Sequence, residues 1–170
     1  NKRNPTPEFK VVRESKTTMT IDADRALGTH VGPWAMQHAI DKAKEFGMGA
    51  VAVTNSGHLA GCGYYAMMAA QQGMIGHCMT AGGSHQTVPT FGSKPVMGTN
   101  PIAWAAPART MPPFLFDVAT TAVAGNKIRL ARRVGTDLLP GWIADGDGNP
   151  IMEETEVPEK YMMLPVGSTR

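Results

Sequence analysis

Charged and aromatic residues are scarce in this chain. Asp, Glu, Lys and Arg make up 18% of the 170 residues, and Phe, Trp and Tyr make up 6%. The formal net charge is +2, from 16 basic and 14 acidic residues, so the chain lacks the basic excess that is typical of nucleic-acid-binding domains. We therefore expect no nucleic-acid partner.

Long apolar runs are absent as well. No stretch reaches the ~18 consecutive apolar residues that a membrane-spanning helix needs, and the first residues, NKRNPTPEFK, lack the apolar core of a signal peptide. We expect a cytoplasmic protein without a membrane partner. Hydrophobic residues nevertheless make up 42% of the chain, which is enough for a sizeable core, and the length fits a single domain over residues 1–170.

Cysteine is rare, and no segment has the spacing of a metal site. Cys62 and Cys78 stand in apolar or glycine-rich surroundings, so we expect reduced, structural thiols. The stretch 145–149 imitates the start of a calcium loop, but Pro150 stands where such a loop needs glycine. A hairpin turn is the better interpretation of this stretch, and no metal ligand is predicted.

The glycine-rich turn of doubly wound dinucleotide-binding folds is also missing. Gly61-Cys62-Gly63 is followed by Tyr64 and Tyr65 instead of the third glycine, and the phosphate loop Gly-x-x-x-x-Gly-Lys does not occur. If this chain binds a dinucleotide, it does so with a different fold.

Alternating and helical periodicities divide the chain into short elements. The first half is predicted to begin with a strand or hairpin over 9–24 that ends at Asp22 or Asp24, followed by a helix with Pro33 in its first turn that runs to Gly47. A strand over 50–54, buried on both faces, comes next. A helix over 64–72, closed by Gly73, and a buried strand over 74–80 complete this half. The second half is predicted to hold an irregular loop over 81–100, strands over 101–106 and 114–118, a basic helix over 122–133, a hairpin turn over 145–149, and no convincing element over 153–170.

His58 is the strongest candidate for chemistry. It follows the predicted strand 50–54 in a polar, glycine-rich turn, and residues at such strand ends are held rigidly yet can reach a cleft. Imidazole changes its charge near neutral pH, so it can pass a proton to a carbonyl oxygen while hydride reaches the carbon. The alternative is a surface or core histidine without a catalytic role, which is our interpretation of the other four: His30, His38, His77 and His85.

Asp117 is the second candidate, at the end of the predicted strand 114–118. Its carboxylate could accept bonds from ribose hydroxyls, and the hydroxyls and amides that follow it could meet phosphate oxygens. The alternative is that Asp117 caps the next helix. Thr99 and Asn100 form a polar turn that could bind a substrate carboxylate, although the same residues are also typical of a plain turn.

Taken in order, these segments resemble the malate/L-lactate dehydrogenase family that is distinct from the Rossmann-type enzymes and includes ureidoglycolate dehydrogenase, sulfolactate dehydrogenase and piperideine-2-carboxylate reductase. The matching stretches are 51–58, 63–65, 73–76, 98–103, 117–120 and 141–145. They run through nearly the whole chain, which makes the resemblance more specific than any single motif. The family's Ser-His-Gly-x-x-Arg substrate motif is absent, so we expect a central fragment that lacks the family's terminal helical parts.

The resemblance implies an α/β fold with a mostly antiparallel or mixed sheet flanked by helices, assembled as a homodimer. It implies hydride transfer between NAD or NADP and C2 of a 2-oxo acid, the matching 2-hydroxy acid or a cyclic imino acid. His58 would be the acid/base residue, the substrate would meet Thr99 and Asn100, and the cofactor would meet Gly82, Asp117, Val118, Ala119, Thr120 and Thr121. The alternative is a noncatalytic remnant or interaction subunit that keeps the fold.

Two features bear on these expectations. Where the family favours His-Phe-Gly, this chain has His58-Leu59-Ala60, and a common Ala-Thr-Ser appears as Ala119-Thr120-Thr121, which keeps a hydroxyl. The basic cluster over 127–133 could favour the additional phosphate of NADP, or it could be a solvated helix face.

Overall fold

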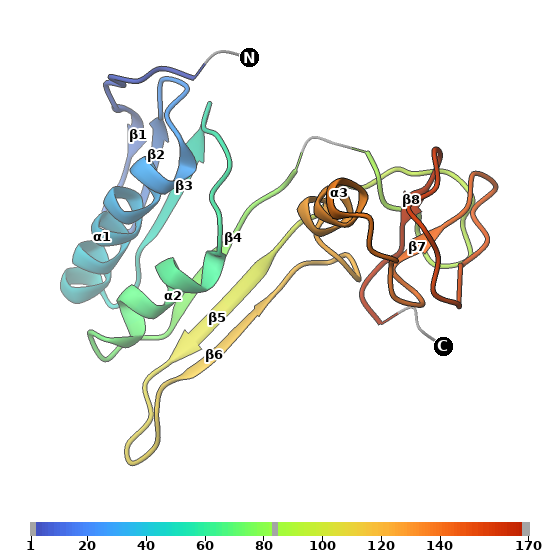
Figure 1. Cartoon of the computed structure of the whole chain (residues 1–170). Coiled ribbons are helices and arrows are strands. Elements are labelled where there is room, and N and C mark those ends of the chain that lie inside the picture. Colours follow the sequence, from blue (N-terminus) through green and yellow to red (C-terminus); the bar gives the residue numbers. More distant parts are fainter. Residues whose placement is uncertain (1–2, 83–84, 168–170) are drawn as a thin grey trace. The chain divides into compact units, whose positions relative to one another are not determined.

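The computed structural model describes residues 3–82 and 85–167, and their contacts divide the chain into two compact units. Unit 1 consists of residues 3–78 and 103–117, and unit 2 consists of the described residues of 79–102 and 118–167. Both units contain helices and strands (Figure 1). The expectation of one domain over residues 1–170 stays a prediction.

The first sheet of unit 1 is mixed. It contains β1 (Lys10–Glu14), β2 (Thr18–Asp22) and β3 (Ala50–Thr54) in that order. β1 and β2 are antiparallel, which confirms the predicted hairpin, whereas β2 and β3 are parallel and are joined through a helix. The α/β class with a mixed sheet is thereby confirmed.

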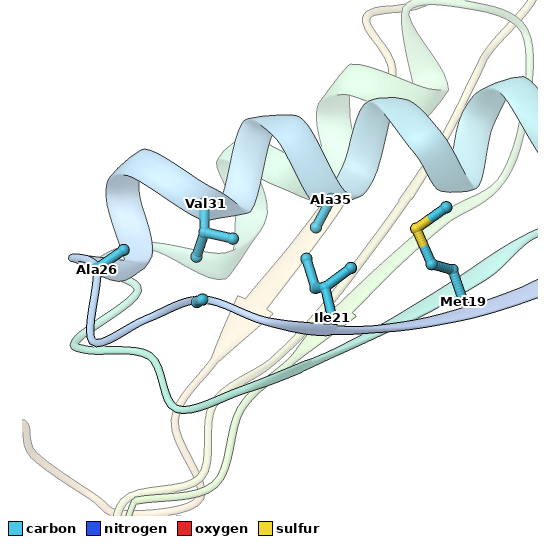
Figure 2. Packing of buried hydrophobic residues seen from close by; sticks show 6 residues of the cluster. Met19, Ile21, Ala26, Val31 and Ala35 are labelled. Atoms are coloured by element: carbon cyan, nitrogen blue, oxygen red, sulfur yellow. The ribbon is translucent and has the colours of Figure 1, made fainter. Parts of the chain in front are cut away.

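Helix α1 (Gly28–Phe46) packs on this sheet through small and branched side chains. Figure 2 shows Met19 and Ile21 of β2 directed toward Val31 and Ala35 of α1. Ile21 is 0% exposed, and truncating a buried isoleucine to alanine costs about 2–5 kcal/mol. Unit 1 therefore owes much of its stability to this contact.

Two expectations for this region are wrong. α1 begins at Gly28, so Pro33 lies inside the helix and not in its first turn. The proline cannot bond to the carbonyl of Thr29, but Thr29 is exposed and water can satisfy that oxygen. β3 alternates between exposed and half-buried positions instead of being buried on both faces, since α1 packs on only one face in the described part of the chain.

A second sheet and helix follow in the chain. Helix α2 spans Cys62–Ala70, and the sheet contains β4 (Gly76–Met79), β5 (Ile102–Ala106) and β6 (Phe114–Val118) in that order. Their shared core consists of small residues: Cys62, Ala66, Ala70, Ala103 and Ala105. A Cβ on Gly76 would lie 2.0 Å from the carbonyl oxygen of Ala66, so glycine allows the close approach of strand and helix. These elements confirm that a helix and three strands lie here, but α2 begins and ends two residues early, and the expectation that 74–80 is a buried strand is wrong, because β4 spans Gly76–Met79 and Ile75 and Met79 are exposed.

Unit 2 has little regular structure. It holds α3 (Gly125–Val134) and the short antiparallel pair β7 (Ile143–Ala144) and β8 (Met162–Met163) around an apolar core. The turn over 145–149 is confirmed, because the N–H of Asp145 donates to the carbonyl of Asn149 at 3.0 Å. Two expectations are wrong: α3 begins at Gly125 and not at 122, and 153–170 does contain a strand, β8.

Three smaller findings concern the thiols, the possible metal ligands and the helices of the described residues. Cys62 and Cys78 are free thiols, and burial raises the pKa of Cys78 to about 12. Over 3–82 and 85–167, no three His, Cys, Asp or Glu side chains lie close enough together to hold a metal ion. None of the helices in these same ranges combines the length and apolarity that crossing a bilayer would require.

Candidate active site

The turn that carries His58 is fixed by backbone bonds to the segment after β2. Asn55 follows β3 with φ +53°, a left-handed conformation that Asn tolerates better than most residues. Its side chain donates to Asp22 Oδ1 at 3.0 Å, and its carbonyl accepts from the N–H of Arg25 at 2.8 Å. The N–H of Gly57 donates to the carbonyl of Ala26 at 2.8 Å. The turn is therefore rigid without using the histidine ring.

The ring of His58 is exposed, and one of its nitrogens is already bonded. Nδ1 accepts from the N–H of Ala60 at 3.1 Å. Because Nδ1 is the acceptor, the neutral ring carries its proton on Nε2. Ala60 has φ +62°, where an L side chain is strained. Among the described residues no hydrogen bond reaches Nε2, so its N–H can donate to another molecule.

Asp117 binds the start of α2 from the end of β6. Its Oδ2 accepts from the N–H of Gly63 at 2.7 Å, and a Cβ on Gly63 would lie 2.8 Å from this oxygen. The alternative that Asp117 caps the next helix is wrong, because the helix that it caps is α2 and not α3. Among the described residues, no hydrogen bond reaches Oδ1, so that oxygen can accept from a ligand.

His58 and the Asp117 carboxylate belong to the same unit and are connected through Gly63, whose N–H donates to Asp117. Gly63 follows His58 by five positions, so their Cα atoms lie at most ~18 Å apart. The candidate acid/base residue and the candidate ribose acceptor therefore lie within a distance that one extended ligand can span.

Unit 2 brings together five other candidate residues. The N–H of Gly82 donates to Asn100 Oδ1 at 2.9 Å, and the N–H of Asn100 donates to Thr120 Oγ1 at 3.2 Å. The hydroxyls of Thr99 and Thr121 lie 3.3 Å apart. These contacts join the polar turn at 98–101 to the segment after β6, two regions that the sequence separates by about twenty positions.

Thr121 has a structural role in this cluster. It is 3% exposed, and its hydroxyl donates to the carbonyl of Val123 at 2.8 Å. The chain around Thr121 is paired with the segment after β8, since the N–H of Ala122 donates to the carbonyl of Leu164 and the N–H of Val166 donates to the carbonyl of Thr120. Val118, the last residue of β6, and Ala119, which follows it, are half-buried. Direct contact of Val118, Ala119 and Thr121 with a cofactor stays a prediction.

The basic side chains of α3 are partly engaged within unit 2. Lys127 lies 5.9 Å from the ring centroid of Trp142, and Arg132 donates to the carbonyl of Pro158 at 2.7 Å. A surface hollow of about 320 Å³ is lined by Asn126, Arg129, Leu130 and Arg133. This hollow is the part of the helix that could accept an anionic group.

Two parts of the site were missed by sequence reasoning. The hydroxyl of Tyr65 donates to the carbonyl of Leu59, next to the histidine, at 2.7 Å. The segment 164–166 pairs with 120–122. Neither contact has a periodic signal, because each joins a loop to a segment outside its own element; the match of 63–65 to a family motif was the one pointer toward Tyr65.

Comparison with known proteins identifies the family. The model for malate/L-lactate dehydrogenase matches residues 1–170. The chain belongs to the malate/L-lactate dehydrogenase family. A malate dehydrogenase from Pyrococcus horikoshii is 43% identical over 161 residues, which are 95% of this chain and 44% of that protein. An L-sulfolactate dehydrogenase from Methanocaldococcus jannaschii is 39% identical over 168 residues, which are 98% of this chain and 48% of that protein.

A solved structure agrees with this assignment to the malate/L-lactate dehydrogenase family. The crystal structure of a malate dehydrogenase from Entamoeba histolytica matches with a TM-score of 0.88 and 35% identity, over 99% of this chain and 48% of that one. The chain thus spans about half the length of the relatives that it matches. The predicted resemblance to this family, and with it a fold distinct from the Rossmann type, is confirmed.

Proposed function

We propose that the protein is an oxidoreductase that transfers hydride between a nicotinamide cofactor and C2 of a 2-oxo acid, the matching 2-hydroxy acid or a cyclic imino acid. The observation that carries the proposal is the exposed His58 ring, bonded to the N–H of Ala60 and five positions before Gly63, whose N–H donates to the Asp117 carboxylate. Membership of the malate/L-lactate dehydrogenase family supports it.

The residues of unit 1 fit a nicotinamide dinucleotide at one defined point. Asp117 keeps Oδ1 for the hydroxyls of a ribose, while Oδ2 is held in place by Gly63. A side chain on Gly63 would fill the space beside this carboxylate. When bound, the cofactor supplies the hydride. Gly82, Val118, Ala119, Thr120 and Thr121 are the further residues proposed to line its site.

His58 is proposed to handle the proton that accompanies the hydride. In the neutral ring, Nε2–H donates a hydrogen bond to the carbonyl oxygen of the substrate and polarises it. Full transfer of that proton requires a doubly protonated ring, in which Nδ1 also carries hydrogen and can no longer accept from Ala60. The contact with Ala60 therefore describes the ring that first meets the substrate, and it opens when Nδ1 takes up a proton from solvent as the Nε2 proton passes to the substrate oxygen.

The substrate carboxylate is proposed to meet Thr99 and Asn100. Both residues are half-buried and sit on a turn before β5, where hydroxyl and amide groups can bond to carboxylate oxygens. NAD and NADP are both compatible with the proposal. The hollow lined by Arg129 and Arg133 suits the additional phosphate of NADP, and titration with each nucleotide decides between them.

Localisation and assembly belong to the same proposal. We propose a cytoplasmic protein, which two free cysteines support, because reducing compartments keep thiols unpaired. We also propose a homodimer, on the basis of the family resemblance.

Replacing His58 tests the proposed function. In the full natural chain, His58→Ala should lower the rate of 2-oxo acid reduction by about 10²–10⁴-fold, because a general acid contributes that much. Binding of NADH or NADPH, followed by fluorescence, should stay within about twofold, since the ring is not proposed to hold the dinucleotide. The matched control is His30→Ala, which removes another exposed histidine of unit 1 and should leave both quantities unchanged.

The outcomes separate the two readings of the chain. Turnover that survives His58→Ala unchanged would show that the ring is structural. A wild-type protein that binds neither nucleotide favours the noncatalytic remnant or interaction subunit instead.

A further inference from the structure

The peptide group between Leu59 and Ala60 is bonded on both of its sides. Its carbonyl oxygen accepts from the hydroxyl of Tyr65 at 2.7 Å, and its N–H donates to Nδ1 of His58 at 3.1 Å. A single rigid plane therefore connects the tyrosine hydroxyl to the imidazole ring. Rotating that plane by half a turn would place a carbonyl, which only accepts, opposite Nδ1.

Tyr65 is itself held firmly by its surroundings. It is 3% exposed, and a Cβ on Gly32 of α1 would lie 2.5 Å from its ring atom Cε1. One turn earlier on the same face of α1, a Cβ on Gly28 would lie 2.7 Å from the carbonyl oxygen of His58. The two glycines let α1 lie directly against the tyrosine and the histidine turn. Burial also raises the pKa of Tyr65, so its hydroxyl keeps the hydrogen that it donates.

We infer that Tyr65 is a positioning residue for His58: its hydroxyl orients the Leu59–Ala60 peptide so that Ala60 N–H faces Nδ1, and the neutral imidazole keeps its proton on Nε2. The left-handed conformation of Ala60 explains why an outside bond is needed, since this backbone is strained when left alone. The link from this arrangement to catalysis rests on the proposed function. The way in which Tyr65 and Ala60 hold the His58 ring does not depend on the proposed function, because it follows from the two hydrogen bonds alone.

The tautomer matters because it decides what the exposed nitrogen offers to a substrate. With hydrogen on Nε2, the ring can donate to a carbonyl oxygen as soon as the substrate arrives. With hydrogen on Nδ1, the exposed nitrogen would be an acceptor and would repel the same oxygen. A buried tyrosine hydroxyl two bonded contacts away from the ring therefore sets the polarity of the candidate site.

The test compares Tyr65→Phe with Tyr64→Phe. Both variants keep the ring and lose one hydroxyl, but Tyr64 is 65% exposed. Long-range ¹H–¹⁵N spectra at a pH where the ring is neutral report which nitrogen of His58 carries hydrogen, and His58→Ala identifies the signals. Wild type and Tyr64→Phe should show the Nε2–H tautomer as the main species. Tyr65→Phe should show a mixture or the Nδ1–H tautomer.

A kinetic measurement then connects the tautomer to turnover in the full natural chain. Tyr65→Phe should lower kcat for 2-oxo acid reduction by about tenfold, as loss of orientation does, and should leave the dissociation constant of the nicotinamide cofactor within about twofold. Tyr64→Phe should match wild type in both quantities. A purely structural role would instead lower the thermal stability and the amount of active protein without changing the spectrum of the ring.

Three results would overturn the inference. The first is a wild-type spectrum in which Nδ1–H is the main tautomer. This result overturns the inference without any variant, so the test remains possible even if Tyr65→Phe does not fold. A folded Tyr65→Phe with the wild-type spectrum does so as well, and an altered spectrum with an unchanged kcat removes the catalytic link. Absence of cofactor binding and turnover in wild type would end the proposed function only, because the spectra still decide how the ring is held.

Discussion

Unit 1 and unit 2 hold their candidate residues in opposite ways. In unit 1, backbone bonds and closely packed glycines fix the turn, and the His58 ring remains exposed. In unit 2, the candidate side chains bond to one another, and Thr121 is buried. A side chain on a turn that the backbone holds can be changed with little loss of stability, whereas a buried hydroxyl within a side-chain network cannot.

The strongest way to test this difference is to remove the buried hydroxyl of unit 2. Thr121→Val keeps the shape of the side chain but leaves the carbonyl of Val123 without its donor. We expect the free energy of unfolding to fall by about 1–3 kcal/mol, the cost of leaving a buried polar group unpaired. Urea denaturation measures it.

Thr87→Val is the matched control within the same unit. Thr87 is 4% exposed, and its hydroxyl has no hydrogen-bond partner among the described residues. Replacing an unpaired buried hydroxyl with a methyl group should leave stability unchanged or raise it. Equal losses in the two variants would mean that the hydroxyl network of Thr121 contributes nothing.

A smaller effect is expected at Asp117, where unit 1 does use a side chain. Asp117→Ala removes the acceptor for the N–H of Gly63 and should lower the free energy of unfolding by about 1 kcal/mol, as the loss of a helix cap does. Asp117→Asn keeps an oxygen at that place and should lose less. Thermal unfolding compares the two, and an equal loss in both would show that the charge, not the hydrogen bond, stabilises α2.

The smallest effect concerns acid stability beside the histidine turn. The backbone N–H of Asp24 and then the side chain of Asn55 donate to Asp22 and lower its pKa below the ordinary value of 3.8. A carboxyl whose pKa is lower in the folded state stabilises the fold above 3.8, and this contribution is lost as the pH falls through the folded pKa.

Asp22→Asn should therefore make the melting temperature less dependent on pH below 3.8. Melting curves recorded from about pH 2 to pH 6 follow the change. Asp137→Asn is the control, because Asp137 accepts no side-chain hydrogen bond from the described residues. If the melting temperature of Asp22→Asn falls with decreasing pH as steeply as that of wild type, Asp22 is not the source of this acid dependence.

The elements that local patterns determine could be predicted well. The strands β3 and β6 match the predicted residues because β3 is a short run of apolar and β-branched side chains after a glycine, and β6 is an aromatic-rich apolar run that begins after the Pro112-Pro113 corner. Gly47 closes α1 as predicted, since its φ is positive and glycine adopts it without strain, whereas α2 is capped by Gln71 and Gly73 lies in the turn that follows. His58 could be found because its turn directly follows such a strand.

The contacts that complete the site could not be predicted, because they join distant positions. The bond from Gly63 to Asp117 spans 54 positions, and the contact between Thr99 and Thr121 spans 22. The start of α1 was misplaced for a related reason. Pro33 is a local signal, but close packing of Gly28 against the histidine turn decides where the helix begins, and periodicity contains no information on that packing.

The glycines of α1 weaken the helix considered by itself. Gly32, inside the helix, lowers intrinsic helix propensity by about 0.8–1.0 kcal/mol relative to alanine, yet alanine at Gly28 or Gly32 would collide with the neighbouring turn or ring. The first turns of α1 are therefore poor helix formers as an isolated peptide and depend on tertiary contact to form. Alanine at Gly32 would favour the helix as an isolated peptide but would collide with the Tyr65 ring, so we expect it to destabilise the folded protein.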